Sequence, residues 1–379
     1  MSYLGEDIPK LGFGMMRLPQ LEEGGTDIEQ VKEMVDVFMA AGLTYFDTAR
    51  AYEGSEDAIR QAVVERYPRD SFQIATKAAA WAGAKSIEDI EEMFETSLKT
   101  LGVDYVDFYL LHNIGNDRTQ FFDKYDMWGF VEKQKELGKI KHIGFSMHDV
   151  SDVLEKALQD HPSMEFVQLQ VNWSDWNAGG VQARECMEVA QKYGVPVVIM
   201  EPVRGGTLAD PPHGVAEIFA NATPKMPPAE WALRFCWNLP NVLTVLSGMS
   251  TLEQVQQNVE SYKRFQPLTE AEMEVYAAAQ EAMAAAVAVP CTSCKYCMKV
   301  CPQGINIAGI FAAVNRKSQF SFRQGQFWYG FMTREAKGSD CIKCGQCVMA
   351  CPQHIDVVEE IAKAVELFED PSLEPVGPS

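Results

Sequence analysis

The stretch TYFDTARAYEGSEDAIRQAVVERYPRDSFQIATK, residues 44–77, contains the pattern that decides the fold. It begins with a short strand-like run, TYFDT (44–48), passes through a segment of helical period at 54–67 and reaches a second strand-like run, FQIATK (72–77). Alternation of short apolar runs with longer amphipathic segments is typical of parallel sheets whose strands are joined by helices. Residues 44–77 therefore predict one strand–helix–strand unit.

This unit recurs through the first 260 residues. The other strand candidates are KLGFG (10–14), YVDFYLLH (105–112), KHIGFS (141–146), FVQLQ (166–170), VPVVIM (195–200) and VLTVLSG (242–248). Helices are expected near 27–41, 54–67, 86–100, 126–137, 149–159, 180–193, 227–238 and 251–261. Eight strands alternating with eight helices predict an α/β protein built on a (β/α)8 TIM barrel, which takes about 250 residues. The alternative, an open doubly wound sheet, would be expected to show G-x-G-x-x-G after its first strand, where this chain has GFGMMRLP.

Polar residues stand at the predicted C-terminal ends of the strands, where barrels of this class gather their chemistry. The residues are Asp47, Lys77, His112, Ser146, Gln168, Gln170, Asn172, Glu201 and Ser247, with Tyr52 in the loop after Asp47. An apolar strand has no use for Asp or Lys at its end unless the two pair or act in catalysis.

Four of these residues have both a structural and a catalytic interpretation. Singly, Asp47 and Lys77 suit a structural ion pair. His112 suits a hydrogen-bonded core histidine, and Tyr52 suits loop packing. Together they suit proton donation, because the Lys77 charge favours the Tyr52 phenolate and is expected to lower the pKa of Tyr52. Asp47 would hold Lys77, and His112 would orient or help to protonate a substrate oxygen while a hydride reaches the carbonyl carbon.

With these residues in place, the chain resembles the aldo-keto reductase family over about residues 8–262. The matching segments, in the family's order, are TYFDTARAYEGSE, ATK, YLLHN, GFS, VQLQVNW, EPVRGG and VLSGMSTLEQVQQN. The resemblance implies a catalytic tetrad of Asp47, Tyr52, Lys77 and His112, with Tyr52 as general acid toward a small carbonyl substrate. It also implies a nicotinamide cofactor that lies extended across the barrel mouth.

The resemblance also implies the residues that would bind this cofactor. The carboxamide would contact Ser146 and Gln168, and the nicotinamide ring would contact Met200, where many members of the family have an aromatic residue. The pyrophosphate segment would comprise Pro202, Arg204, Gly205, Gly206 and Leu208, and the adenosine end would contact Ser250, Gln254 and Asn258. The loop GMSTLEQVQQN carries no Arg or Lys. Because a 2′-phosphate is usually bound by a cation, NADPH, which the family favours, and NADH both stay open. Arg204 or Lys263 would supply the charge.

Two cysteine runs near the C-terminus, CTSCKYCMKVCPQG from Cys291 and CIKCGQCVMACPQH from Cys341, both fit C-x2-C-x2-C-x3-C-P. This is the pattern of bacterial two-cluster ferredoxins, in which the fourth cysteine of each run serves the other cluster. The pattern predicts two [4Fe-4S] clusters rather than zinc sites, which need only four ligands and commonly use two CxxC pairs. One cluster would be bound by Cys291, Cys294, Cys297 and Cys351, and the other by Cys341, Cys344, Cys347 and Cys301.

The 39 residues between the runs, 302–340, are long enough for helices. INIAGIFAAVNRK is expected to be helical, and QFSFRQGQFWYGF to be an aromatic-rich helix or loop. The tail is therefore predicted to be a small, mainly helical dicluster domain at 288–379, resembling the α-helical ferredoxins of respiratory complexes. It would follow a barrel domain at 1–287, whose last helix, about 270–287, is opened by a capping box of Thr269 and Glu272. Cys186 and Cys236 are expected to be buried thiols.

The formal net charge of −20 argues against nucleic acid or an anionic membrane as a partner, because both need a basic surface. The N-terminal residues have neither the basic nor the apolar region of an export signal. No apolar stretch reaches the roughly 20 residues that span a bilayer. We therefore expect a cytoplasmic protein, and in a reducing cytosol clustered cysteines are metal ligands or redox groups more often than disulfides.

Hydride transfer moves two electrons and a cubane cluster accepts one, yet the chain shows no flavin signature that would join the two. Three hypotheses follow. The first is an NAD(P)H-dependent carbonyl reductase whose clusters are structural or relay electrons. The second is an electron-transfer protein whose barrel binds a redox partner such as a ferredoxin or flavoprotein. The third is a radical reductase fed by single electrons. Trp81, Trp173 and Trp176 are expected either to line a substrate pocket or to pack in the core.

Overall fold

The computed structural model describes residues 4–115, 118–178, 181–291 and 293–373. The contacts divide the chain into two units, each of which is described by itself. The first contains the described residues up to Arg204 together with Ala229–Thr269, and the second contains Gly205–Pro228 together with the described residues from Glu270 onward. The contacts thus assign the helix at Glu270–Ala285 to the second unit, while a boundary at 287/288 remains a sequence prediction.

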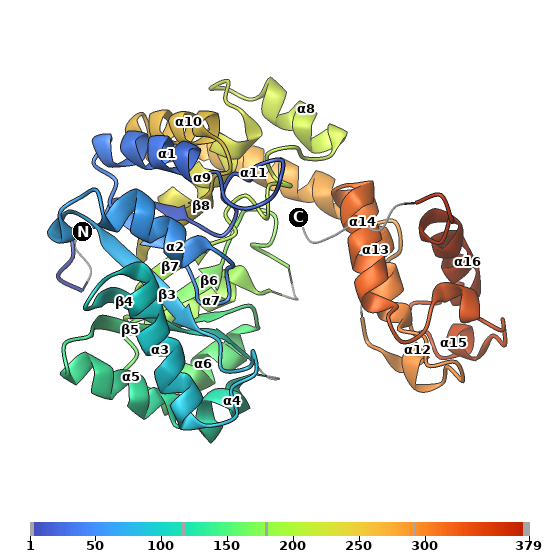
Figure 1. The fold of residues 1–379 in the computed structure, drawn as a ribbon. Coiled ribbons are helices and arrows are strands. Elements are labelled where there is room, and N and C mark those ends of the chain that lie inside the picture. Colours follow the sequence, from blue (N-terminus) through green and yellow to red (C-terminus); the bar gives the residue numbers. More distant parts are fainter. Residues whose placement is uncertain (1–3, 116–117, 179–180, 292, 374–379) are drawn as a thin grey trace. The chain divides into compact units, whose positions relative to one another are not determined.

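The first unit is built on eight parallel strands that close into a barrel in sequence order, with β1 hydrogen-bonded to β8 (Figure 1). The strands are β1 (Leu11–Gly14), β2 (Tyr45–Asp47), β3 (Gln73–Ala78), β4 (Val106–Ile114), β5 (Ile140–Met147), β6 (Phe166–Gln170), β7 (Val197–Met200) and β8 (Val242–Gly248). Strands buried on both faces read as continuous apolar runs, and VDFYLL at the start of β4 is buried throughout. The predicted (β/α)8 barrel is confirmed, and every predicted strand overlaps an observed one.

Helices follow the strands and cover the outside of the barrel (Figure 1). They are α1 (Ile28–Ala40), α2 (Ser55–Ile59), α3 (Ile87–Leu101), α4 (Thr119–Lys124), α5 (Met127–Glu136), α6 (Ser151–Asp160), α7 (Ala183–Lys192), α9 (Pro228–Asn238) and α10 (Leu252–Lys263). The helix predicted at 54–67 is a short α-helix continued by a π-helical turn, Arg60–Val64. Residue 180, where another predicted helix begins, lies outside the described residues, and α4 was not predicted.

The interior of the barrel is filled by side chains, so the barrel is not a pore. Large residues from several strands pack together there, and Leu4 and Ile8 pack against them from the segment before β1. The packed group contains Tyr45, Ala75, Phe108, Leu110, Phe166, Val198, Leu243 and Leu246. Because the interior is closed, the strand ends and the loops that follow them are left to form a site.

The described residues of the second unit form helices and loops and contain no strand. Its helices are α8 (His213–Asn221), α11 (Glu270–Ala285), α12 (Tyr296–Lys299), α13 (Ile307–Gln319), α14 (Phe322–Met332), α15 (Gln346–Met349) and α16 (Val357–Phe368). Helices α13 and α14 pack along each other, as do α13 and α16. The segments expected to be helical, INIAGIFAAVNRK and the aromatic-rich stretch after it, correspond to α13 and α14.

The two cysteine runs adopt the same local backbone, fifty residues apart. Both have left-handed residues at matched positions, with φ of 55° at Ser293 and 55° at Lys343, and 62° at Lys295 and 74° at Gly345. In both, a short helix follows, α12 or α15, and these two helices contact each other. A side-chain oxygen then caps the next long helix, through Asn306 for α13 and Asp356 for α16. The cysteine repeat in the sequence is thus a structural repeat.

Candidate active site and cluster-binding module

A buried ion pair lies at the mouth of the barrel. The Lys77 ammonium, at the end of β3, donates to Asp47 Oδ1 at the end of β2 over 2.6 Å and to the Thr48 carbonyl over 2.7 Å. The two side chains are almost inaccessible, with 1% of Lys77 and 4% of Asp47 exposed. Neighbouring parallel strands bring their ends together. Asp47 therefore holds Lys77 in one orientation.

Tyr52 and His112 complete this group. Lys77 Nζ lies 5.1 Å from the centroid of the Tyr52 ring. The Tyr52 and His112 rings meet edge to face, with their centroids 5.7 Å apart and their planes at 87°. The structure thus brings the four predicted catalytic residues, Asp47, Tyr52, Lys77 and His112, into one cluster.

The expectation that the pKa of Tyr52 is lowered is wrong. Burial raises the pKa of Tyr52, and Asp47 and Glu201 also raise it. Lys77 lowers it, as the sequence suggested, but the net shift is upward. Desolvation of the phenolate outweighs the effect of the lysine charge. Tyr52 is therefore held in its neutral, proton-bearing form at neutral pH.

His112 is also held neutral. Burial, together with the nearby Lys77, His148 and Arg118, lowers the pKa of His112 to about 3. Its Nδ1 atom is buried and has no hydrogen-bond partner among the described residues. A neutral imidazole with a free ring nitrogen can orient a polar ligand by hydrogen bonding, but it carries no spare proton at neutral pH.

The loop that carries Tyr52 is fixed by residues that the sequence reasoning did not single out. The Glu56 carboxylate is buried and accepts hydrogen bonds from Thr76 Oγ1 (2.8 Å) and Arg50 Nη1 (2.9 Å). Ser55 Oγ is 2.6 Å from Thr48 Oγ1 and donates to the Met15 carbonyl over 2.8 Å. A glutamate at the start of a predicted surface helix gave no signal of burial.

Three predicted nicotinamide contacts, Ser146, Gln168 and Met200, lie on β5, β6 and β7. Ser146 Oγ accepts from the Asn113 backbone NH over 2.8 Å, and Gln168 Nε2 lies 3.7 Å from Met200 Sδ. Gln168 Oε1 is buried and has no hydrogen-bond partner among the described residues. A buried acceptor without a partner suits a ligand that donates N–H groups, so these residues fit a carboxamide.

A polar network after β6 contains Asp175, a residue that the sequence reasoning missed. Asp175 Oδ2 accepts from Gln170 Nε2 (2.8 Å) and Asn172 Nδ2 (2.9 Å), and it lies 3.2 Å from Arg204 Nε. Asn172 Nδ2 also lies 3.2 Å from the Glu201 carbonyl. This network holds the turn after β7, where Glu201 and Arg204 have positive φ values of 58° and 51°.

The other predicted pyrophosphate residues fall on both sides of the division between the units. Pro202 is buried next to Arg204 in the first unit. Gly205, Gly206 and Leu208 begin the second unit, with φ of 64° at Gly205 and 94° at Gly206, and Leu208 is buried.

Of the three predicted adenosine contacts, Ser250 precedes α10, Gln254 lies in its first turn and Asn258 near its middle. Ser250 N donates to Gln254 Oε1 over 2.7 Å, and Ser250 Oγ donates to the Arg17 carbonyl over 2.7 Å. Asn258 Nδ2 donates to Ser247 Oγ over 3.0 Å. The network connects α10 to the end of β8 and to the loop after β1.

The three candidate pocket tryptophans have different environments. Trp81 Nε1 donates to the His112 carbonyl over 2.7 Å, and its ring lies edge-on to the His112 ring at 5.7 Å. Trp173 is fully buried and belongs to the core. Trp176 packs edge-on against Phe235 at 5.3 Å. Of the three, Trp81 is the one that borders the catalytic cluster.

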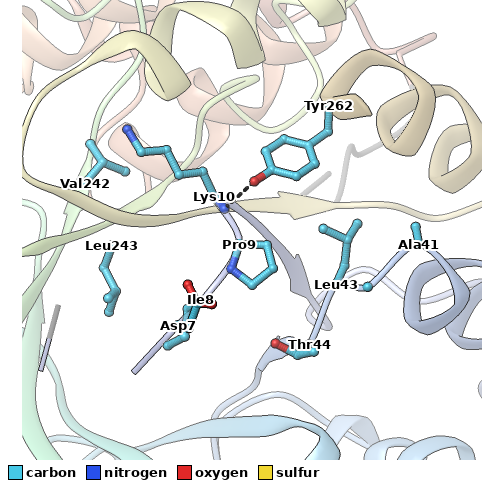
Figure 2. Close-up of a pocket in the computed structure, with 11 residues that line it drawn as sticks. Asp7, Ile8, Pro9, Lys10, Ala41, Leu43, Thr44, Val242, Leu243 and Tyr262 are labelled. Atoms are coloured by element: carbon cyan, nitrogen blue, oxygen red, sulfur yellow. Dashed lines mark hydrogen bonds between the residues drawn. The ribbon is translucent and has the colours of Figure 1, made fainter. Parts of the chain in front are cut away.

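A cavity of about 450 Å³ lies at the other end of the barrel (Figure 2). Its lining includes residues that precede strands, such as Lys10 before β1 and Thr44 before β2. The Lys10 backbone NH donates to the Tyr262 hydroxyl over 3.0 Å, and Lys10 Nζ donates to the Trp237 carbonyl over 3.1 Å. In barrels of this class the N-terminal end of the strands serves stability rather than chemistry, so we do not assign the active site to this cavity.

In the second unit, four cysteines line one hollow. They are Cys301 from the first run and Cys341, Cys344 and Cys347 from the second. Apolar side chains, including Ile305, Ile307 and Ile361, line the rest. This is the set predicted to bind the second cluster.

The cysteines of the other predicted set are also neighbours. Burial raises the pKa of Cys291, and Cys294 and Cys351 raise it further, which places Cys351 beside the first run. Burial raises the pKa of Cys297 to about 11, with added effects of Cys291 and Cys294. Among the described residues, no group of three or more Cys, His, Asp or Glu side chains lies close enough to hold a single metal ion. The thiols surround apolar space, which fits a cluster of several irons.

Cys186 and Cys236, the remaining cysteines, are buried in α7 and α9 as expected. Burial raises the pKa of Cys186 to about 12 and raises that of Cys236 still more. Both are therefore held as thiols.

Comparison with known proteins agrees with this geometry. The model of the aldo/keto reductase family matches residues 10–281. The chain belongs to the aldo/keto reductase family. The model of the 4Fe-4S dicluster domain matches residues 290–355. The chain is thus an aldo/keto reductase barrel fused to an iron–sulfur dicluster domain, and its family is one of oxidoreductases.

Similar members of the family include an aldo-keto reductase of Mycobacterium sp. (strain MCS), which is 29% identical over 68% of this chain and 83% of its own length. The holo form of an aldo-keto reductase from Bacillus halodurans is 25% identical, with a TM-score of 0.58 over 73% of this chain and 93% of that chain. An aldo/keto reductase from Klebsiella pneumoniae, solved with NADP and acetate, shares the fold at 23% identity, with a TM-score of 0.57 over 71% of this chain and 90% of that chain. In the described part of this chain, no helix is long and apolar enough to cross a membrane.

Proposed function

We propose that the barrel reduces a small carbonyl substrate with NADPH or NADH and that Tyr52 is the general acid. The observation that carries the proposal is the buried contact of Lys77 with Asp47 beneath the Tyr52 ring. A lysine that is held in place next to a neutral tyrosine provides a proton donor together with the charge that stabilises the phenolate left behind.

A bound dihydronicotinamide would supply the hydride to the carbonyl carbon. Tyr52 would donate its hydroxyl proton to the carbonyl oxygen, and the resulting phenolate would be stabilised by Lys77. Asp47 holds Lys77 in place, and neutral His112 would orient the carbonyl oxygen by donating a ring N–H. Gln168 Oε1, Ser146 and Met200 would contact the carboxamide end of the cofactor. Its pyrophosphate would contact Pro202, Arg204, Gly205, Gly206 and Leu208. Its adenosine would contact Ser250, Gln254 and Asn258.

The test is Tyr52→Phe in the iron-loaded protein, assayed anaerobically with NADPH and with NADH against a panel of aldehydes and ketones. We expect the reduction rate to fall by about 10²–10⁴-fold, the range that general acid catalysis contributes. The visible absorbance of the clusters should stay unchanged. Tyr193→Phe, which removes the hydroxyl of a tyrosine bonded to Glu155 at a distance from the site, is the matched control and should keep full activity. Turnover by Tyr52→Phe at the wild-type rate would refute the assignment.

A second candidate function is electron transfer through the cluster module, with the barrel binding a substrate or a partner. The four cysteines around one apolar hollow and the match to a dicluster domain favour it. Anaerobic titration with NADPH and then NADH, with and without added flavin, separates the two candidates. Bleaching of the clusters by the nicotinamide alone would show that the barrel and the clusters exchange electrons. Turnover of a carbonyl without any bleaching would assign the clusters a structural role.

A further inference from the structure

The segment that carries the two cysteine runs has a charge opposite to that of the rest of the chain. Residues 290–355 contain eight lysines and arginines and two acidic residues, a formal charge of +6. The whole chain carries −20, so the remaining residues carry −26. Acidic residues resume directly after this segment on α16, where Lys363 pairs with Glu359 (2.9 Å) and Glu360 (2.7 Å). Within the cluster module the excess of cations therefore lies in the segment of the two cysteine runs, because residues 356–379 carry −6.

Three of these cations stand within the cysteine runs themselves. Lys295 and Lys299 lie in the first run and Lys343 in the second, and all three are exposed. No described carboxylate pairs with any of them. Like charges on one surface repel each other, and an oppositely charged partner relieves that repulsion.

Exposed apolar side chains lie between these lysines. Ile342 is 60% exposed, Met349 is 82% exposed and Tyr296 is 53% exposed. Lys299 Nζ lies 5.6 Å from the centroid of the Tyr296 ring, so the two side chains share one surface. We define the cluster face as the exposed lysines and exposed large apolar residues of the two runs: Lys295, Tyr296, Lys299, Val300, Ile342, Lys343 and Met349.

Two observations place the cluster face next to the redox groups. Helices α12 and α15, one from each run, contact each other, so the two runs are neighbours. Cys294 and Cys344, the second cysteine of each run, are exposed in the same loops. A protein docked on this face would therefore approach the edges of both clusters closely.

We propose that the cluster face docks a small acidic protein that carries one electron. Its acidic surface would be steered and held by Lys295, Lys299 and Lys343, while the exposed apolar side chains supply contact area. The carrier loses one electron and a cluster of this chain gains one, with no bond made or broken and no proton moved. A nucleic acid would also be attracted to lysines, but its phosphate backbone offers no apolar contact to the exposed Ile342 and Met349, whereas a protein surface does. The proposal does not depend on carbonyl reduction by the barrel.

The test measures binding of an acidic bacterial ferredoxin, in its oxidised state, to the iron-loaded full chain by anaerobic calorimetry. The test variant is K295E/K299E/K343E. The matched control is K85E/K99E/K133E, which makes the same change in net charge at three exposed lysines of the barrel that have no carboxylate partner among the described residues. We expect the test variant to bind about ten-fold or more weakly, because like charges then face each other, and the control to bind as the wild type does. Binding of the wild type should also weaken between about 0.05 M and 0.5 M salt, because surface charges are screened.

Two further variants keep the test valid if the charge-reversed variant loses its iron. K295Q/K299Q/K343Q removes the charges and retains side chains of similar length, and I342Q/M349Q removes the apolar contacts. Both should keep the iron content and weaken binding. Wild-type affinity in the glutamate or glutamine variants would overturn the proposal, as would equal loss in the barrel control. A wild type that binds a DNA oligonucleotide but not the ferredoxin at low salt would assign the face to nucleic acid instead.

Discussion

At the scale of single residues, burial decides which protonation states the catalytic cluster can use. Lys77 is inaccessible to solvent and is satisfied by Asp47 Oδ1 and the Thr48 carbonyl. Burial raises the pKa of Asp47, and Lys77 and Gln168 oppose that shift. Asp47 and Lys77 therefore depend on each other, because either charge left alone in this site would be costly.

A double-mutant cycle tests this dependence. Lys77→Met leaves the Asp47 carboxylate buried without its cation, and Asp47→Leu leaves Lys77 without its anion. Each single variant should be destabilised by about 3–5 kcal/mol. The double variant Asp47→Leu/Lys77→Met should be less destabilised than either single one, because no buried charge remains unpaired. Chemical unfolding followed by tryptophan fluorescence gives the four free energies, and additive losses would contradict the dependence.

The lowered pKa of His112 predicts that the stability of the barrel depends on pH. Its pKa is lowered from 6.5 to about 3 in the folded chain, so below pH 6.5 the unfolded chain binds a proton that the folded chain does not. The contribution of His112 is complete above pH 6.5 and is lost as the pH falls toward 3. His112→Gln should reduce the slope of unfolding free energy between pH 6 and pH 5 by up to about 1.4 kcal/mol per unit. Equal slopes in wild type and variant would exclude this role for His112.

The sequence could predict the positions of Asp47, Lys77 and His112, because the ends of neighbouring parallel strands meet and buried strand ends do not tolerate unpaired charge. It could not predict the net pKa shift of Tyr52, because desolvation depends on how far the surrounding loops cover the ring. Asp175 and Glu56 were missed for a related reason. Both lie outside the strands, and only the folded loops show that their carboxylates are buried and accept hydrogen bonds.

At the scale of elements, the close approach of β5 and β6 depends on a glycine. Gly144 pairs in register with Phe166. A Cβ atom at residue 144 would lie 2.3 Å from the Phe166 backbone carbonyl oxygen, a contact that a side-chain rotation cannot relieve. The strands that carry Ser146 and Gln168 are therefore held next to each other by the absence of a side chain.

Gly144→Ala should destabilise the barrel by about 3 kcal/mol or more, because the two backbones must separate to admit the methyl group. Gly14→Ala on β1 is the matched control, since a Cβ there would meet the Ser247 carbonyl at an ordinary 3.5 Å. The control should lose much less stability. Thermal unfolding of both variants makes the comparison, and similar losses in the two would refute the close-approach argument.

Elements with strong periodicity could be predicted from the sequence, and short ones could not. All eight strands and the helices that follow them show apolar periodicity, because each packs one face or both faces into a core. Helices α4 and α8 have 6 and 9 residues, and α12 and α15 have 4 each. Such helices are too short to show a period, and α12 and α15 depend on left-handed residues at their start.

At the scale of the whole molecule, two units with different sources of stability share one chain. The barrel encloses a large core with fully buried side chains from every strand. The core of the cluster module is small and includes Cys297 and Cys347 themselves. Small domains with few apolar contacts usually need metals or disulfides to stay folded.

Iron removal should therefore unfold the cluster module and leave the barrel folded. We expect anaerobic chelation to increase hydrogen exchange in α13 and α16 toward the rate of an unfolded chain, while β1–β8 remain protected. Hydrogen exchange with mass spectrometry resolves both regions in one sample. Protection of α13 and α16 that survives complete loss of iron would show that the module's apolar core suffices.

The hollow lined by Cys301 has a consequence for how the protein is made. Its walls come from the first cysteine run, the second run and α16, up to Ile361. During synthesis, Cys301 leaves the ribosome 60 residues before Ile361 does. Through that interval the first run is exposed as free thiols with no place for a cluster, whereas the barrel strands are already outside. A cluster can therefore occupy the complete hollow only after the chain has been made as far as α16, and a chain that terminates before α16 would lack part of its walls.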